Sequence, residues 1–353
     1  MNKAIILTGG LFDTSYAKTA HGLVRGTERF DIVGIVDENN GGKLANEIVP
    51  HGRPVPVYST LSDFFSHMPG LASHCILGVA TKGGTLPPSI RPQIIECIRL
   101  GLHVVNGLHQ LLSDDPELNE LAGRNGVEIL DIRKPKPFHS LRFWDGSIER
   151  VSSYKIAVLG TDCSVGKRTT ARFLTLGLRE AGINTEMIYT GQTGWMQGAG
   201  YGFIFDATLN DFISGELEGA LLKCFNEKQP RVILIEGQSG LRNPSGPCGA
   251  EFILSAASNA VILQIVPNRT YFTGLEYYPA KIPSAGDEIK LIECYGVPVI
   301  ALTVNTEGMS PDEALLFATN LENEVNIPVV LPIGQGVGRL VNLITKNLEK
   351  HEN

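Results

Sequence analysis

The chain has 353 residues, of which 43% are hydrophobic and 19% charged, and its formal net charge is −7 at pH 7. This length favours two domains, and the acidic balance without a lysine- or arginine-rich cluster excludes nucleic acid as a partner. No apolar run approaches about 18 residues and no export signal is visible, so we expect a cytoplasmic protein with no membrane partner.

Residues 1–133 alternate between strand-like and helix-like patterns. Strand patterns occupy 4–7, 31–36, 74–79, 103–105 and 127–131, and helical patterns occupy 17–25, 92–100 and 116–125. Such alternation is typical of a parallel sheet, so a Rossmann-like domain is predicted. Its first turn carries Gly9 and Gly10 but lacks the third glycine of a dinucleotide fingerprint, although Asp37 ends the second strand where a ribose-binding acid would lie. Hydride transfer therefore ranks last among the functions considered.

Residues 134–153 are predicted to connect this domain to a second one. The sequence Lys134-Pro135-Lys136-Pro137 cannot continue a helix or fill a central strand, because proline lacks an N–H donor and restricts its predecessor. Residues 143–148 then indicate a small hairpin or a loop.

Residues 154–353 are predicted to form a second parallel α/β domain that begins with a phosphate-binding loop. An apolar strand at 155–159 delivers a glycine-bounded loop to a helical pattern. Backbone N–H groups and the helix dipole at such a junction favour an anion, and Lys167 adds a point charge. The match to G-x-x-x-x-G-K-[ST] is imperfect, because the first glycine comes one residue early and Arg168 stands where a serine or threonine would bind magnesium.

Two further strands of this half end in polar residues. The strand 185–189 precedes a glycine-rich loop at 190–198 with amide, hydroxyl and indole groups, which suits substrate recognition. The apolar strand 231–236 ends in Glu236, where P-loop proteins carry their second acidic group. With another strand predicted at 261–266, the fold class is α/β, a Rossmann-like parallel sheet followed by a P-loop NTPase-like parallel sheet.

These motifs resemble two groups of known proteins. The early-starting loop and the Glu236-Gly237 pair are similar to those of the dethiobiotin synthetase branch of P-loop proteins. Over the full length, the Rossmann-like domain, the connector residues 131–135, the loop 160–170 and residues 191–194 resemble the D-glutamate N-acetyltransferase family, long catalogued as a domain of unknown function. The resemblance implies transfer of the acetyl group of acetyl-CoA to the amine of D-glutamate.

Coenzyme A carries a pyrophosphate and a 3′-phosphate, which a loop built for polyphosphate can hold without a metal ion. Arg168 in the magnesium-ligand position fits such a ligand. No metal site is predicted, because the cysteines and histidines show no ligand spacing. The residues expected to bind the coenzyme are Thr161, Asp162, Cys163, Ser164, Val165, Gly166, Lys167, Arg168, Thr169 and Thr170.

Acetyl transfer to an amine needs a base for the amine proton and donors for the oxyanion that develops on the thioester carbonyl. The base candidates are Glu236, Asp206 and Asp211, and Glu236 is preferred because the two aspartates stand where they could cap a helix. The residues expected to contact the dicarboxylate substrate, from the 190–198 loop and from arginines able to pair with a carboxylate, are Gln192, Thr193, Arg242 and Arg269.

Two other functions stay open at this point. The dethiobiotin synthetase likeness favours an ATP- and magnesium-dependent ligase or kinase acting on a small carboxylate, with Thr169 or Thr170, Asp162 and Glu236 supplying the ligands that Arg168 does not. A non-catalytic sensor would bind nucleotide or coenzyme A without turnover. Because isologous dimers are the commonest assembly, a homodimer is expected.

Overall fold

The computed structural model describes residues 1–352 and divides the chain into two compact units. Unit 1 comprises Met1–Pro135 together with Gln192–Ala199, and unit 2 comprises Lys136–Gly191 and the residues from Gly200 onward. Every pairing between named strands is parallel, so the predicted class of two parallel α/β sheets is confirmed. Within residues 1–352, no helix is both long enough and apolar enough to cross a membrane.

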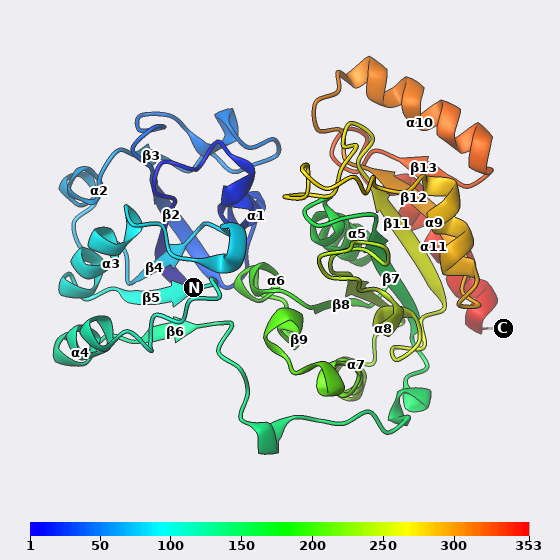
Figure 1. The fold of residues 1–353 in the computed structure, drawn as a ribbon, viewed down its shortest axis with the longest axis horizontal. Helices are drawn as coiled ribbons and strands as arrows, with labels where there is room; N and C mark the ends of the chain where they lie inside the picture. The colour runs from blue at the N-terminus through cyan, green and yellow to red at the C-terminus, as the bar shows by residue number, and fades with distance from the viewer. Residues whose placement is uncertain (353) are drawn as a thin grey trace. The chain divides into compact units, whose positions relative to one another are not determined.

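The sheet of unit 1 has the strand order β3-β2-β1-β4-β5-β6 (Figure 1). Its strands are β1 (Asn2–Leu7), β2 (Phe30–Val36), β3 (Val57–Tyr58), β4 (His74–Leu77), β5 (His103–Asn106) and β6 (Ile129–Asp131). Its helices are α1 (Lys18–Arg25), α2 (Leu61–His67), α3 (Ile90–Arg99), α4 (Pro116–Asn125) and α6 (Gln192–Met196), with 3₁₀ turns η1 (Ser15–Ala17), η2 (Ala45–Glu47) and η3 (Lys82–Gly84).

The two faces of this sheet are covered by different helices. Alternate residues of a strand point to opposite faces. Ile5 and Leu7 of β1 share a core with α2, α3 and α4, whereas Ala4 and Ile6 share a core with α1 and α6. Helix α6 therefore completes a face on which α1 packs, although the sequence predicts its residues as part of an irregular loop in the second domain.

The segment that contains α6 is bound to unit 1 by its side chains and its backbone. Met196 is fully buried in the core shared with β1. The Thr27 hydroxyl donates to the Met196 carbonyl at 2.8 Å, and the Gln197 amide donates to the carbonyls of Gly22 and Gly26 at 2.7 and 3.1 Å. A stretch that follows β8 (Thr185–Tyr189) in the chain thus supplies core and hydrogen bonds to the Rossmann-like unit.

The sheet of unit 2 has the strand order β13-β12-β11-β7-β10-β8-β9 (Figure 1). Its strands are β7 (Tyr154–Gly160), β8 (Thr185–Tyr189), β9 (Tyr201–Gly202), β10 (Val232–Glu236), β11 (Ala260–Ile265), β12 (Val299–Val304) and β13 (Val329–Val330). Its helices are α5 (Lys167–Glu180), α7 (Ile213–Lys228), α8 (Ala250–Ile253), α9 (Ala285–Glu293), α10 (Pro311–Val325) and α11 (Gly338–Glu352), with 3₁₀ turns η4 (Phe138–Ser140), η5 (Ser147–Arg150), η6 (Phe205–Ala207) and η7 (Asn210–Phe212).

Strand β7 is central in this sheet and buried along its whole length. Ala157 and Leu159 face a core built with α7, α8, α9 and α10, while Ile156 faces a second core built with α5 and α11. Because β7 lies between β11 and β10, the loop after it is flanked by the carboxyl ends of both neighbours. This edge is where parallel sheets commonly bind ligands.

The region predicted as a connector packs onto α7 of unit 2 and contains 3₁₀ turns and loop rather than a hairpin. Two buried glutamates of α7 hold it. The carboxylate of Glu218, which is fully buried, accepts the backbone N–H groups of Asp145 and Ile148 at 3.1 and 3.0 Å. Glu216 likewise binds the Lys136 ammonium. These contacts hold residues 136–148 on unit 2, whereas Lys134 and Pro135 belong to unit 1.

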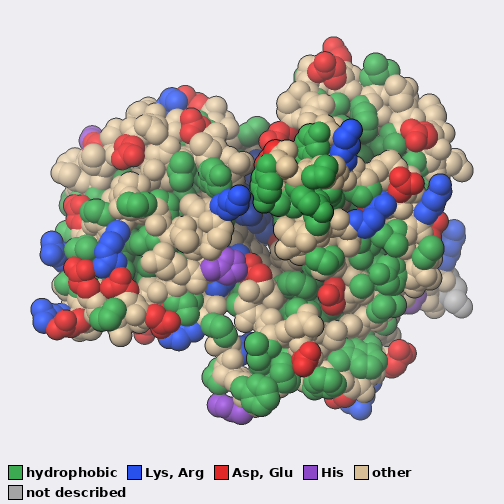
Figure 2. All heavy atoms as spheres, viewed as in Figure 1, with side chains coloured by type: hydrophobic (Ala, Val, Ile, Leu, Met, Phe, Trp, Pro, Cys, Tyr) green, Lys and Arg blue, Asp and Glu red, His purple; other side chains and the backbone are tan. Residues whose placement is uncertain are grey.

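On the face shown in Figure 2, lysine and arginine side chains lie among acidic ones and do not form a continuous basic surface.

Candidate functional site

The loop between β7 and α5 approaches its own backbone closely. A Cβ atom on Gly160 would lie 2.7 Å from Val165 Cγ2 and 3.0 Å from the Lys167 side chain. Gly166, with φ of 113°, precedes the first residue of α5 in a conformation that other residues rarely adopt. Glycine at both ends therefore lets the backbone turn sharply into the α5 N-terminus, where N–H groups and the helix dipole favour an anion.

The ammonium group of Lys167 is fixed beside this loop. Lys167 is buried, and its Nζ donates to the carbonyls of Asp162 at 2.6 Å and Ser239 at 2.7 Å. Burial lowers its pKa, while the nearby thiols and the carboxylates of Asp162 and Glu236 act in the opposite direction. An ammonium has three N–H donors, so one can bind a phosphate while the other two hold the side chain in place.

One buried hydroxyl of the loop has no partner in the structure. Thr161 is 3% exposed, and its Oγ1 atom is buried without a hydrogen bond. Because nearly all buried polar groups are paired in folded proteins, such an atom marks a place where a bound molecule can supply the partner.

Glu236 ends β10 at the same edge of the sheet, and the residue is 5% exposed. It accepts the backbone N–H of Thr190 at 3.1 Å. Burial raises the pKa of this carboxyl, and the positive charges of Arg168 and Lys167 partly oppose the shift. A carboxylate with a raised pKa can take up a proton closer to neutral pH than an exposed glutamate can.

Arg168 follows Lys167 in the first turn of α5 and interacts electrostatically with Glu236. Its Nε atom is buried and has no hydrogen-bond partner. Burial lowers the pKa of the guanidinium, and Glu236 raises it. Lys167, Arg168 and Glu236 thus form a group in which two cations face one carboxylate.

Two of the residues that an ATP- and magnesium-dependent reaction would use as metal ligands, Thr170 and Asp162, are already hydrogen-bonded to other protein groups. The Thr170 hydroxyl donates to the Gln264 amide oxygen at 2.6 Å and so links α5 to β11. The Asp162 carboxylate accepts the Thr273 backbone N–H at 2.8 Å and an Arg269 N–H at 3.1 Å. Within residues 1–352, no group of three or more His, Cys, Asp or Glu side chains is arranged for a metal ion.

Asp162 joins the phosphate loop to two other loops. Besides Thr273 and Arg269, it accepts the side-chain amide of Asn243 at 2.9 Å. Arg269 also donates to the Cys163 carbonyl at 2.9 Å and to the Glu307 carboxylate at 3.1 Å. Arg269, predicted to contact substrate, is therefore also an ion-pair partner of the loop itself.

The other predicted substrate residues lie in different surroundings. Arg242 forms an ion pair with the buried Glu288 of α9 at 2.8 Å. Gln192 and Thr193 are buried in α6 of unit 1, where the Thr193 hydroxyl lies 3.1 Å from that of Thr19.

The remaining base candidates are on the surface of unit 2. Asp206 and Asp211 are exposed on the 3₁₀ turns η6 and η7, which precede α7. Helix α7 begins after Phe212 and has no side-chain cap, so the alternative role of these aspartates as caps of this helix is not seen. Of the three candidates, only Glu236 is buried beside Lys167.

Ser239 is a site residue that sequence reasoning missed. It is one of two carbonyl partners of Lys167 and has a φ of 40°, unusual for a residue with a side chain. A Cβ atom on its neighbour Gly240 would lie 2.7 Å from the Thr161 carbonyl oxygen. The glycines that flank Gln238-Ser239 directly after Glu236 were the available signal, because they indicate close backbone approach.

The first turn of the Rossmann-like unit is filled by protein side chains. A Cβ atom on Gly9 would lie 2.7 Å from Ile90 of α3. The Asp37 carboxylate accepts the Thr8 hydroxyl at 2.6 Å and the Phe12 N–H at 3.0 Å. Asp37 thus fixes the backbone of this first turn.

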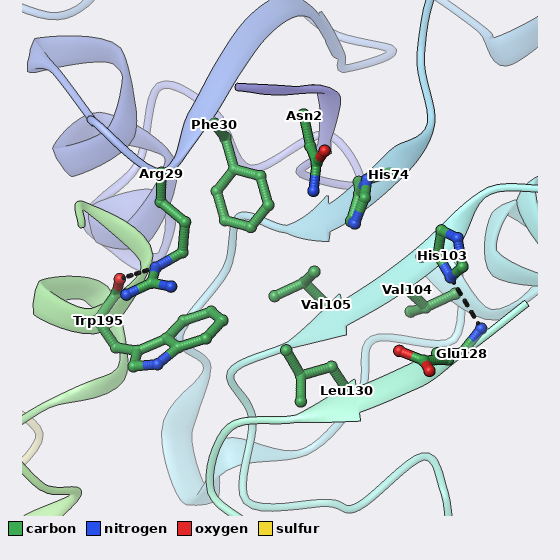
Figure 3. A pocket seen from close by; sticks show the side chains of 10 residues that line it. All are labelled: Asn2, Arg29, Phe30, His74, His103, Val104, Val105, Glu128, Leu130 and Trp195. Atoms are coloured by element: carbon green, nitrogen blue, oxygen red, sulfur yellow. Dashed lines mark hydrogen bonds between the residues drawn. The ribbon is translucent and has the colours of Figure 1, made fainter. Parts of the chain in front are cut away.

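A pocket of about 190 Å³ lies at the amino ends of strands in unit 1 (Figure 3). On one side the Arg29 guanidinium lies 4.0 Å from the centre of the Trp195 ring, and on the other the rings of His74 and His103 are 5.0 Å apart. Trp195 comes from α6, so the segment that joins unit 1 from later in the chain also shapes this pocket.

Comparison with known proteins gives matches to both halves. Residues 142–341 match the P-loop domain of a domain-of-unknown-function family, DUF1611, and residues 38–135 match its Rossmann-like domain. A D-glutamate N-acetyltransferase from Tritonibacter scottomollicae is 30% identical over 284 residues, which cover 77% of this chain and 81% of that protein. A D-glutamate N-acetyltransferase from a Pseudoalteromonas species is 30% identical over 273 residues, which cover 75% of this chain and 79% of that protein.

A solved structure agrees with these matches. The crystal structure of a DUF1611 family protein from Anabaena variabilis superimposes with a TM-score of 0.89 at 25% identity, covering 98% of this chain and all of that one. The resemblance over the full length to the family long catalogued as a domain of unknown function is thereby confirmed. The chain belongs to the DUF1611 family, in which a Rossmann-like domain is joined to a P-loop domain.

Proposed function

We propose that this protein is an N-acetyltransferase that moves the acetyl group of acetyl-CoA to the amine of D-glutamate. The observation that carries the proposal is the 30% identity, over 77% of the chain, to a protein named D-glutamate N-acetyltransferase. The chemistry of the phosphate loop supports it.

The loop offers a cradle that fits the phosphates of coenzyme A. The α5 N-terminus supplies backbone N–H groups, Lys167 supplies a fixed ammonium, and the unpaired Thr161 hydroxyl supplies a further donor. Together they match the charge and the acceptor atoms of a pyrophosphate. Ser164 is exposed and Cys163 and Thr169 are half-buried, so parts of the loop remain open to solvent.

Glu236 is our proposed general base. Once the substrate ammonium has lost a proton to solvent, its nitrogen forms a bond to the thioester carbonyl carbon. The proton that this nitrogen then releases passes to the Glu236 carboxylate, the carbon–sulfur bond breaks, and the departing thiolate takes that proton to leave as coenzyme A thiol. The raised pKa of Glu236 suits both transfers.

The two carboxylates of the substrate require cationic or N–H partners. Arg242 and Arg269 already pair with Glu288 and Asp162, but a guanidinium has five N–H groups and can bind a second carboxylate. Their part in substrate binding, like that of Gln192 and Thr193, stays a prediction.

The test mixes the protein with acetyl-CoA and D-glutamate in EDTA and follows thiol release, with mass spectrometry of the product. N-acetylglutamate formed in EDTA is the expected result, and L-glutamate in a parallel reaction gives the stereochemical preference. Binding of acetyl-CoA without product would favour a sensor. Release of ADP from ATP and magnesium, with no acetyl product, would favour the ligase or kinase.

A further inference from the structure

The P-loop fold implies a magnesium–nucleotide complex, and the residues of this loop do not fit one. In P-loop NTPases the hydroxyl of the residue after the loop lysine binds the magnesium ion. Here that residue is Arg168, which has no ligand atom for a cation. Thr170 is no substitute, because its hydroxyl is hydrogen-bonded to Gln264 inside the sheet.

The Arg168 side chain is half-buried. Its Nε atom is buried and unpaired, and its positive charge is the largest of the influences that oppose the raised pKa of Glu236. In P-loop proteins the acidic group at the end of this neighbouring strand serves the metal ion. A positive side chain thus stands beside the carboxylate that would otherwise serve a metal.

We infer that the Arg168 guanidinium takes the place of the metal ion and makes the loop select a metal-free polyphosphate ester over a magnesium–nucleotide complex. A guanidinium can donate to phosphate oxygens and balance Glu236 at the same time. Together with Lys167, the Arg168 guanidinium also repels a divalent cation. This repulsion disfavours the magnesium complex of a nucleotide. The choice of coenzyme A as the ligand rests on the proposed function, whereas the exclusion of magnesium does not.

Two substitutions separate the charge of Arg168 from the missing hydroxyl. Arg168→Ser restores the Gly-Lys-Ser sequence and removes the cation, whereas Arg168→Gln removes the cation without adding a hydroxyl. Titration calorimetry on the full chain with coenzyme A and with ATP, each in EDTA and in magnesium, measures both effects. Circular dichroism and thermal unfolding of each variant show whether it is folded.

For the wild type we expect a coenzyme A affinity that changes less than about twofold on adding magnesium. We expect its ATP affinity to fall, because magnesium binds ATP itself and the loop favours the metal-free form. In both variants coenzyme A binding in EDTA weakens by about tenfold, the usual effect of losing one charge-assisted hydrogen bond. Only Arg168→Ser gains magnesium-dependent binding of ATP, tighter by about tenfold or more than in EDTA.

Tighter binding of ATP by the wild type in magnesium than in EDTA would overturn the inference, and this result needs no variant to fold. Equal behaviour of the two variants toward magnesium, or unchanged coenzyme A affinity in both, would overturn it as well. Failure of the proposed function is distinguishable: the wild type would then form no acetylated product, yet its preference for the metal-free ligand and the difference between the variants would persist.

Discussion

At the phosphate loop, burial acts in opposite directions on two residues of opposite charge. It lowers the pKa of the Lys167 ammonium and raises that of the Glu236 carboxyl, and each charge partly offsets the shift of the other. Removing either side chain therefore changes the environment of its neighbour as well as its own contacts, so binding and turnover must be measured separately.

Replacing Lys167 by alanine is expected to weaken coenzyme A binding. The substitution removes a charge-assisted hydrogen bond to phosphate, so the dissociation constant should rise by about tenfold or more. Titration calorimetry measures it. Lys223→Ala, an exposed lysine of α7, is the matched control and should leave the affinity unchanged. Wild-type affinity in Lys167→Ala would place the phosphates elsewhere.

Replacing Glu236 by glutamine is expected to lower kcat by about 100-fold, within the usual contribution of a general base, and to leave coenzyme A affinity nearly unchanged. The base works when ionised, and its pKa is raised by burial. The wild-type rate should therefore fall as the pH drops through a value above the usual glutamate range. The pH–rate profile of Glu236→Gln should lack this acidic limb.

The two exposed aspartates provide the comparison for Glu236. Asp206→Asn and Asp211→Asn should keep wild-type kcat and the same acidic limb if Glu236 is the base. A loss of about 100-fold in either variant, with Glu236→Gln active, would transfer the role.

At the scale of single elements, α7, a helix of 16 residues, holds a segment that lies outside the sheet. Its buried face includes the charged residues Glu216 and Glu218 among apolar ones. Their carboxylates accept backbone N–H groups of the region between Lys136 and Arg150, which has no β-strand partner of its own among the described residues. Hydrogen bonds to these carboxylates therefore pair the backbone N–H groups of this region, as hydrogen bonds between strands do within a sheet.

Glu218→Ala is expected to destabilise unit 2 by about 2–3 kcal/mol, because the buried N–H of Ile148 and the part-buried N–H of Asp145 lose their acceptor. Urea unfolding measures the loss, and limited proteolysis should show faster cleavage within residues 136–150. Glu324→Ala, at an exposed position of α10, should stay within about 0.5 kcal/mol of the wild type. Unchanged cleavage in Glu218→Ala would mean that apolar packing alone holds the region.

At the scale of the whole molecule, the chain leaves one unit and returns to it. After β8 it contributes Gln192–Ala199 to unit 1 and then resumes in unit 2 at Gly200. The fully buried Met196 side chain belongs to the core of β1 and α1. The folding of unit 1 is therefore expected to depend on residues 192–199, which lie far along the chain from its first segment.

Met196→Ala tests this dependence. Truncating a fully buried methionine costs about 2–5 kcal/mol through lost burial and the cavity left behind. Hydrogen exchange should become faster in peptides of β1 and β4 and stay unchanged in β10. Met187→Ala, in β8 of unit 2 and 7% exposed, should show the reverse pattern. Faster exchange confined to unit 2 in Met196→Ala would contradict the assignment of this segment.

The sequence by itself was sufficient to predict the loop between a buried strand and a helix at Lys167 and the position of Glu236 at the end of a strand. It also predicted most of the strands in the first two thirds of the chain. Lys167 follows a buried strand and a glycine turn within a dozen residues, and Glu236 ends an uninterrupted apolar strand. Such features depend on neighbours in the chain, whose periodicity and turn chemistry are visible in the sequence.

Only the tertiary structure decided which distant groups meet. Arg269 pairs with Asp162 across 107 positions because β11 and β7 are neighbours in the sheet, and Lys167 reaches the Ser239 carbonyl because β10 lies on the other side. The place of α6 in unit 1 likewise follows from an open sheet face that no local pattern of residues 190–198 reveals. Strand order and long-range burial, which the chain does not encode locally, set these contacts.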